Sequence, residues 1–248
     1  MNSSRDLAPP AYRVVNEAGK SSIVLVCEHA SRYIPEHYVG LGLSSADLER
    51  HIAWDIGAES VAVELSRVLD AQLILANYSR LIIDLNRPLD SATSIPEVSE
   101  TTRIPGNSGI SLLERRHRAS EYFTPFHQRL TQLLDAREAE KRQSVIVGVH
   151  SFTPSFKGVS RPWHAGVLFR RSQTFGSWLA ARLGGSAANI AENEPYRIED
   201  DGDYTVPVHG EARGLDAVLV EIRQDLIATE AGAKAWATRL ADALQEWR

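Results

Sequence analysis

Residues whose side chains can do chemistry stand directly after several apolar runs of this 248-residue sequence. Strands buried in a parallel sheet read as continuous apolar runs, and sites in such folds lie beyond the carboxyl ends of the strands. Histidines, acids and arginines would therefore meet at one edge of one sheet. They stand at the ends of the runs 22–27 (Glu28, His29), 80–84 (Asp84, Asn86, Arg87), 144–149 (His150, Ser151) and 216–222 (Glu221, Arg223).

This set of residue types suits metal-assisted hydrolysis. A catalytic zinc takes three protein ligands from His, Asp and Glu and keeps one position open for water. His29 and His150 form the natural pair, although a single histidine at a strand end is more often a hydrogen-bonded cap. The third ligand stays open here. Glu28 adjoins His29, and consecutive strand residues face opposite sides. Asp55 is the better candidate, but it also suits the N-cap of a helix, the role that residue physics alone slightly favours.

A hydrolase of this kind also needs a base and a means of holding its substrate. Glu221, at a buried strand end, can accept a proton and deliver it to a leaving amine, with a pKa set by desolvation and a nearby metal. The alternative for Glu221 is an ion pair with Arg223, which shares its face of the strand. Arg80, Asn86 and Arg87 could bind a substrate carboxylate, which a guanidinium matches bidentately. Alternatively, these arginines only brace loops.

Composition removes several other classes of function. The single cysteine excludes an intrachain disulfide and any multi-cysteine metal site, and it favours a reducing, cytoplasmic setting. The net charge of −5 argues against a nucleic-acid partner, and no apolar run is long enough for a transmembrane helix. The sequence contains no serine-hydrolase elbow, His-Glu-x-x-His motif or phosphate loop. Cys27 could act as a nucleophile, but it closes an apolar run, where cysteines are usually inert.

The elements that must position these residues alternate between strands and helices. We expect strands at 22–27, 72–76, 80–84, 144–149, 164–169 and 216–222, and helices at 58–69, 111–140, 173–183 and near the C-terminal end. The alternation predicts an α/β fold of three layers around a mostly parallel sheet, in a single domain over 1–248 with 1–18 peripheral. Two long irregular segments, 85–110 and 191–213, would close over the site, the second with Tyr204 and His209.

Several longer motifs resemble the N-formylglutamate amidohydrolase family over roughly residues 20 to 230. They are VCEHAS (26–31), HIAWDIGA (51–58), SRLIIDLNRP (79–88), GVHSFTP (148–154), NEPY (193–196) and EIRQDLI (221–227). That family is similar in fold to the zinc carboxypeptidases, a phosphorylase/hydrolase-like architecture whose metal-bound water attacks an amide. The chain departs from the pattern at one place, because many members read Pro-His-Ser-Gly where this sequence has Glu28-His29-Ala30-Ser31.

The resemblance implies a site with one divalent metal ion, zinc, and it makes Asp55 the third ligand. It also implies a glutamate that moves the proton, an arginine at the oxyanion and an Asn-Arg pair on the substrate carboxylate. The residues concerned are the ligands His29, Asp55 and His150, the catalytic Glu221 and Arg80, and the carboxylate-binding Asn86 and Arg87.

The reaction implied is hydrolysis of N-formyl-L-glutamate to formate and L-glutamate, a step in histidine degradation. The partner is then a small N-acyl amino acid, with no nucleic acid and no membrane. One alternative is a deacylase of another N-acyl amino acid or peptide-like amide on the same site. Another is a catalytically silent relative that binds an amino-acid-like molecule. The sequence leaves open the oligomeric state, the order of the two long segments, and any contribution of Glu28, Tyr204 or His209.

Overall fold

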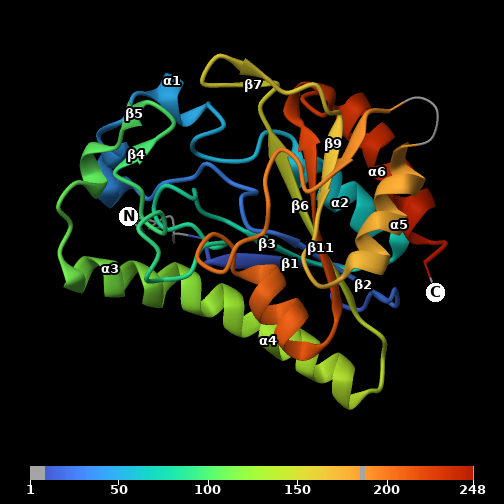
Figure 1. Cartoon of the computed structure of the whole chain (residues 1–248). Coiled ribbons are helices and arrows are strands. Elements are labelled where there is room, and N and C mark those ends of the chain that lie inside the picture. Colours follow the sequence, from blue (N-terminus) through green and yellow to red (C-terminus); the bar gives the residue numbers. More distant parts are fainter. Residues whose placement is uncertain (1–8, 185–187, 248) are drawn as a thin grey trace, which may run out of the picture.

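A seven-stranded sheet runs through the centre of the molecule (Figure 1). The computed structural model describes residues 9–184 and 188–247. The strand order is β1-β3-β2-β6-β11-β9-β10. The strands are β1 (Tyr12–Val15), β2 (Ile23–Cys27), β3 (Gln72–Ala76), β6 (Val145–Phe152), β9 (Ala165–Leu168), β10 (Ile190–Glu192) and β11 (Asp216–Arg223).

The middle of the sheet is parallel, as the sequence predicts. β3, β2, β6 and β11 are parallel neighbours, whereas β1 pairs with β3 and β9 pairs with β11 in antiparallel fashion. Every residue of β2, β3 and β6 is buried, which explains why these strands read as unbroken apolar runs. Two strands of this sheet were not expected. β1 lies within the segment 1–18, which was expected to be peripheral, and β10 lies at the start of the second irregular segment.

Helices cover both faces of the sheet and give the three predicted layers (Figure 1). α2 (Ala58–Leu69), α5 (Gln173–Gly184) and α6 (Glu230–Leu244) lie on one face and form one core with Leu25 and Cys27 of β2. On the other face, α4 (Thr124–Ala139) packs against Val24 and Val26. Alternate residues of β2 thus belong to two separate cores, because successive side chains of a strand point to opposite sides. No described helix has the length and apolar character that a bilayer crossing requires.

The long helix expected at 111–140 is divided into three pieces. α3 (Leu112–Arg118) is followed by a π-helical turn, η3 (Ala119–Phe123), and then by α4. The predicted cap is present, because the Ser111 hydroxyl accepts a hydrogen bond from the Glu114 N–H at 3.1 Å. The remaining small elements are α1 (Ser45–Leu48), the hairpin β4 (Val98–Ser99) with β5 (Thr102–Arg103), and the hairpin β7 (Ser155–Phe156) with β8 (Val159–Ser160).

The strand predicted at 80–84 is wrong, because this apolar run forms a buried turn. Its backbone is satisfied by main-chain turn bonds and by side chains, not by a neighbouring strand. Asn107 donates to the Leu81 carbonyl at 2.8 Å, and Arg118 donates to the Ile82 carbonyl at 3.0 Å. Burial of the backbone requires only that its polar groups find partners, so an apolar run can be buried without joining a sheet. The same two side chains bond to each other at 2.7 Å and hold the segment 85–110 in place.

Two buried histidines connect α4 to η4 (Thr205–Gly210), a π-helical turn. His127 donates from Nε2 to the Leu85 carbonyl at 2.8 Å, so its Nδ1 accepts from His209 Nε2 at 3.0 Å. Burial lowers the pKa of His127 to about 4 and that of His209 to about 3. Both rings are therefore neutral in the folded protein at neutral pH.

This pair predicts a loss of stability in mild acid. An unfolded chain protonates each histidine near pH 6.5, but the folded protein resists until about pH 4 or 3. As the pH falls between those values, the unfolded chain binds a proton at each histidine that the folded protein does not bind. Each histidine then lowers the free energy of unfolding by about 1.4 kcal/mol per pH unit. His209→Gln keeps a donor for His127 and removes one of the two titrations. Denaturant unfolding at several pH values from 6.5 to 4 gives the slope of the free energy of unfolding against pH. That slope should be smaller by about 1.4 kcal/mol per pH unit in the variant than in the parent. Equal slopes would contradict the prediction.

Candidate active site

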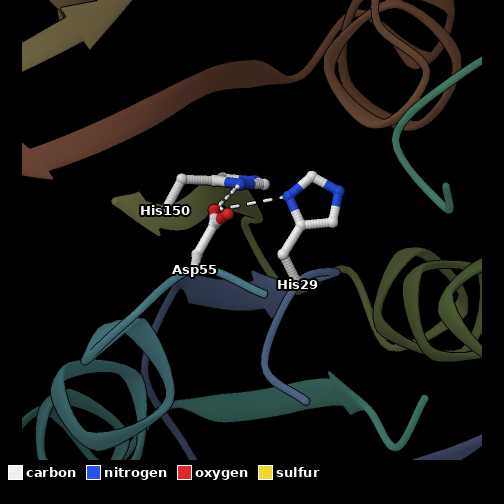
Figure 2. Close-up of side chains that lie close together, drawn as sticks. All are labelled: His29, Asp55 and His150. Atoms are coloured by element: carbon white, nitrogen blue, oxygen red, sulfur yellow. Dashed lines mark hydrogen bonds and ion pairs between the residues drawn. The ribbon is translucent and has the colours of Figure 1, made fainter. Parts of the chain in front are cut away.

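His29, Asp55 and His150 meet at the carboxyl edge of the sheet (Figure 2). His29 lies two residues beyond β2, His150 lies near the end of β6, and Asp55 lies in the loop before α2. Asp55 Oδ2 lies 2.9 Å from His150 Nδ1 and 3.3 Å from His29 Nδ1. All three residues are buried, and one ligand atom from each lies within 4.8 Å of the other two. Side chains that lie between 26 and 121 residues apart in the sequence thus converge.

Asp55 does not cap a helix, which was the alternative for this residue. α2 begins after Gly57 at the N-cap, and no side chain caps it. The local backbone fixes Asp55 instead, because its N–H donates to the His29 carbonyl at 2.9 Å. The Ser151 N–H donates to Asp55 Oδ2 at 3.3 Å. The carboxylate therefore faces the two histidines, where a ligand would be needed.

The second ring nitrogen of each histidine also faces a carboxylate. His29 Nε2 lies 2.8 Å from Asp84 Oδ1, and His150 Nε2 lies 3.1 Å from Glu28 Oε2, although the latter pair is out of line for a hydrogen bond. Metal-binding histidines usually carry such a partner on the nitrogen away from the metal, which fixes the ring and its tautomer. Neither partner was assigned a role from the sequence. The signal that could have found them was their place at the ends of two apolar runs.

Strong electrostatic coupling holds this cluster in an ionised state. Burial alone would raise the pKa of the Asp84 carboxyl, but Arg80 and His29 outweigh it and hold the pKa well below its usual range. His29 and His150 likewise lower the pKa of Asp55 against the effect of burial. Buried carboxylates need such compensating charge, which here comes from rings and a guanidinium. Two imidazole nitrogens and one carboxylate oxygen, backed by further carboxylates, form a donor set that fits a divalent cation such as zinc.

Glu221 stands beside this cluster on β11. Its Cα is paired with that of His150 on β6, so both side chains rise from the same face of neighbouring strands. Burial raises the pKa of Glu221 to about 7, with Asp55 adding to the rise and His150 opposing it. Its Oε2 has no hydrogen-bond partner among the described residues. The alternative ion pair with Arg223 is absent, because Arg223 binds Asp225 at 2.8 Å.

A cavity of about 450 Å³ opens on the cluster and on Glu221. Both long irregular segments form its walls, the first through Ser99 and Glu100, the second through residues from Tyr196 to Asp203. Tyr204 and His209 do not line the cavity. Both pack against the His127 ring, His209 stacked on it and Tyr204 tilted to it. The predicted site residues that do line it are His29, Asp55, Arg80, Asn86, Arg87, His150 and Glu221.

The three polar residues predicted to act on substrate have different surroundings. Arg80 donates twice to Asp84, at 2.6 and 3.0 Å, and once to Asp55 at 3.3 Å, so it already braces the carboxylates around the histidines. Both ends of the Asn86 amide are engaged, because its Oδ1 accepts two backbone N–H groups and its Nδ2 donates to Asp203 at 3.1 Å. The Arg87 guanidinium makes no hydrogen bond to any described residue, and Arg87 lines the cavity.

One further arginine supports the cavity, and its role was not predicted from the sequence. Arg161 donates to the Tyr196 hydroxyl at 3.0 Å, and its guanidinium stacks on the Tyr196 ring at 4.8 Å from the centroid. It also lies over Phe156 at 4.6 Å. These contacts fix the Tyr196 ring in the wall. No local pattern distinguishes Arg161 from the other arginines of this arginine-rich sequence, whereas Tyr196 belongs to the NEPY motif.

The fold and this site together define an amide-cleaving hydrolase built on a mostly parallel α/β sheet. The chain belongs to the N-formylglutamate amidohydrolase family, whose family model matches residues 21–228. The family resemblance expected from the motifs is thereby confirmed.

Two solved structures are similar to this chain over nearly its whole length. Gene product Atu2144 from Agrobacterium tumefaciens is 38% identical, with 96% of each chain covered and a TM-score of 0.92. The N-formylglutamate amidohydrolase from Ralstonia eutropha JMP134 is 17% identical, with 95% of this chain and 96% of that chain covered and a TM-score of 0.71. At that identity the second likeness shows a shared fold. A search of the curated proteins found no match.

Proposed function

We propose that this protein is a metal-dependent amidohydrolase that cleaves N-formyl-L-glutamate to formate and L-glutamate. The observation that carries the proposal is the convergence of His29, Asp55 and His150 on one point, beside Glu221 and at the base of a cavity. Family membership supports the substrate, and the donor set supports zinc. Histidine degradation as the setting and the cytoplasm as the location stay predictions, the latter resting on the single cysteine.

In this proposal His29, Asp55 and His150 would hold the metal, which when bound would supply a water of lowered pKa and a Lewis acid for the amide carbonyl. Glu221 takes the proton from the attacking water and delivers it to the nitrogen that leaves as the carbon–nitrogen bond breaks. A carboxyl with a pKa near 7 can do both at neutral pH. Arg80, a cation at the cavity, stabilises the negative oxygen of the tetrahedral state.

Arg87 is assigned to bind the substrate carboxylate. Asn86 supports the part of the cavity wall next to Arg87. Removing the guanidinium should weaken substrate binding and leave the reacting groups in place. Arg87→Ala is expected to raise KM for N-formylglutamate by about 10-fold to 100-fold, the loss of one charge-assisted contact, with kcat changed far less. Steady-state formate release measures both constants. Arg103→Ala, an exposed arginine of the same segment, is the matched control, and an unchanged KM in Arg87→Ala would remove Arg87 from the substrate site.

The proposal is tested by metal analysis of the purified protein together with an assay of formate release. A panel of formyl, acetyl and succinyl groups on Glu, Asp and Gln then identifies the acyl group and the amino acid. Near-stoichiometric metal and highest kcat/KM for N-formylglutamate are expected. Metal with preference for another acyl group would give the deacylase alternative. Binding of an amino-acid ligand with no metal and no turnover would give the catalytically silent one.

A further inference from the structure

Thr205 connects the wall of the cavity to the cluster of buried carboxylates. It is the first residue of the π-helical turn η4, and its side chain is fully buried. Its N–H donates to Asn86 Oδ1 at 3.0 Å, and its hydroxyl donates to Glu28 Oε1. Single π-helical turns are rare and are frequently found at functional sites. Thr205 has no place in the proposed chemistry, yet both of its polar groups are bound to residues that surround the site.

Glu28 depends on very few partners for a fully buried carboxylate. One oxygen accepts from Thr205, and the other faces His150 Nε2 at 3.1 Å. A buried carboxylate without partners is strongly unfavourable, and each lost partner leaves part of its charge uncompensated. Removal of the Thr205 hydroxyl would therefore leave Glu28 with His150 as its remaining side-chain partner among the described residues. The position of the carboxylate would no longer be fixed from both ends.

The position of Glu28 matters because of the tautomer that His150 must adopt. Its Nδ1 faces Asp55 at the point where the three ligand atoms meet. For Nδ1 to offer a lone pair to a cation, the ring proton must reside on Nε2. The Glu28 oxygen lies 3.1 Å from Nε2 and, although the pair is out of line for a hydrogen bond, places a negative charge beside the nitrogen that must carry that proton. A carboxylate in this place favours the binding tautomer and raises the basicity of the ligand.

We propose that Glu28 and Thr205 are positioning residues for the metal: Thr205 fixes the Glu28 carboxylate, and Glu28 holds the His150 ring with Nδ1 toward the cation. The inference rests on the proposed metal site and goes beyond it, because it assigns metal affinity to two residues that do not touch the metal. It also gives a role to Glu28, which has no part in the proposed chemistry. Through the Asn86 contact, the same threonine links this support to the substrate wall.

The test is the zinc dissociation constant, measured by competition with a chromophoric chelator. Thr205→Val keeps the shape and removes the hydroxyl, and it should weaken zinc binding by about 10-fold to 100-fold. Glu28→Gln should do the same, because an amide oxygen is a weaker acceptor than a carboxylate. Thr205→Ser restores the hydroxyl and should return the affinity to within about 3-fold of the parent, a rescue that a merely structural role for the side-chain bulk would not give.

A control separates metal affinity from general stability. Ser66 lies on α2, outside the cavity, and its buried hydroxyl donates to the Ala71 carbonyl. Ser66→Ala should lower the melting temperature without changing zinc affinity. Parent-like zinc affinity in both Thr205→Val and Glu28→Gln would overturn the inference and leave the proposed function intact. A parent protein that binds no zinc would overturn both. If Thr205→Val does not fold, Glu28→Gln and Thr205→Ser still decide the outcome.

Discussion

Glu221→Gln is expected to lower kcat for amide hydrolysis by about 10²-fold to 10⁴-fold while the protein keeps its full metal content. The amide has nearly the shape of the carboxyl but cannot accept the proton. In the present structure the buried Oε2 of Glu221 has no hydrogen-bond partner among the described residues. Glu28 also has an unpartnered Oε2, but its other oxygen accepts from Thr205, and Asp55 and Asp84 are both bound to histidines. Burial raises its pKa to about 7, so it can both accept and release a proton at neutral pH.

The experiment compares turnover and metal content in the same samples. Single-turnover and steady-state formate release give the rate of the chemical step, and elemental analysis gives the occupancy. Glu211→Gln is a suitable control, because Glu211 is also a buried glutamate but pairs with Arg170 outside the cavity. It should keep kcat near the parental value. A Glu221→Gln protein with full metal and near-parental kcat would show that another group moves the proton.

The sequence predicted the sheet well because its central strands are buried on both faces. β2, β3, β6 and β11 contain continuous apolar runs. The same property led to the error at 80–84, whose central residues Leu81, Ile82 and Ile83 are also apolar and buried. There the side chains of Asn107 and Arg118, which lie far along the chain, bind the backbone carbonyls. A local pattern reports burial, and it cannot report which group satisfies the backbone.

The residues of the candidate site also fall into those that the sequence predicted and those that it did not. The residues that end buried strands could be proposed from the sequence, because topology alone brings the carboxyl ends of parallel strands together. Asp55 required the family resemblance, since its residue type and place suit a helix cap equally well. Arg161 and Thr205 left no usable signal. Their importance comes from contacts with Tyr196 and Glu28, which are 35 and 177 residues away.

His150→Ala, or removal of metal by a chelator, is expected to abolish hydrolysis, and only the chelated parent should recover on addition of zinc. His150 supplies one of three ligand atoms, and its loss also leaves Glu28 without its charged partner. Metal bound to the folded state stabilises it by about 4 kcal/mol when the free metal is a thousand times the dissociation constant. The parent should therefore melt at a higher temperature with zinc than after chelation.

The variant should show no such difference, because it lacks the tight site through which zinc acts on stability. His117→Ala is the matched control, since His117 is an exposed histidine on α3 and should leave both activity and the zinc-dependent shift unchanged. Each outcome discriminates. Tight zinc binding by His150→Ala would remove His150 from the ligand set. Hydrolysis by fully chelated parent protein would mean that Glu221 and Arg80 suffice without a metal, and the metal-dependent proposal would then be wrong.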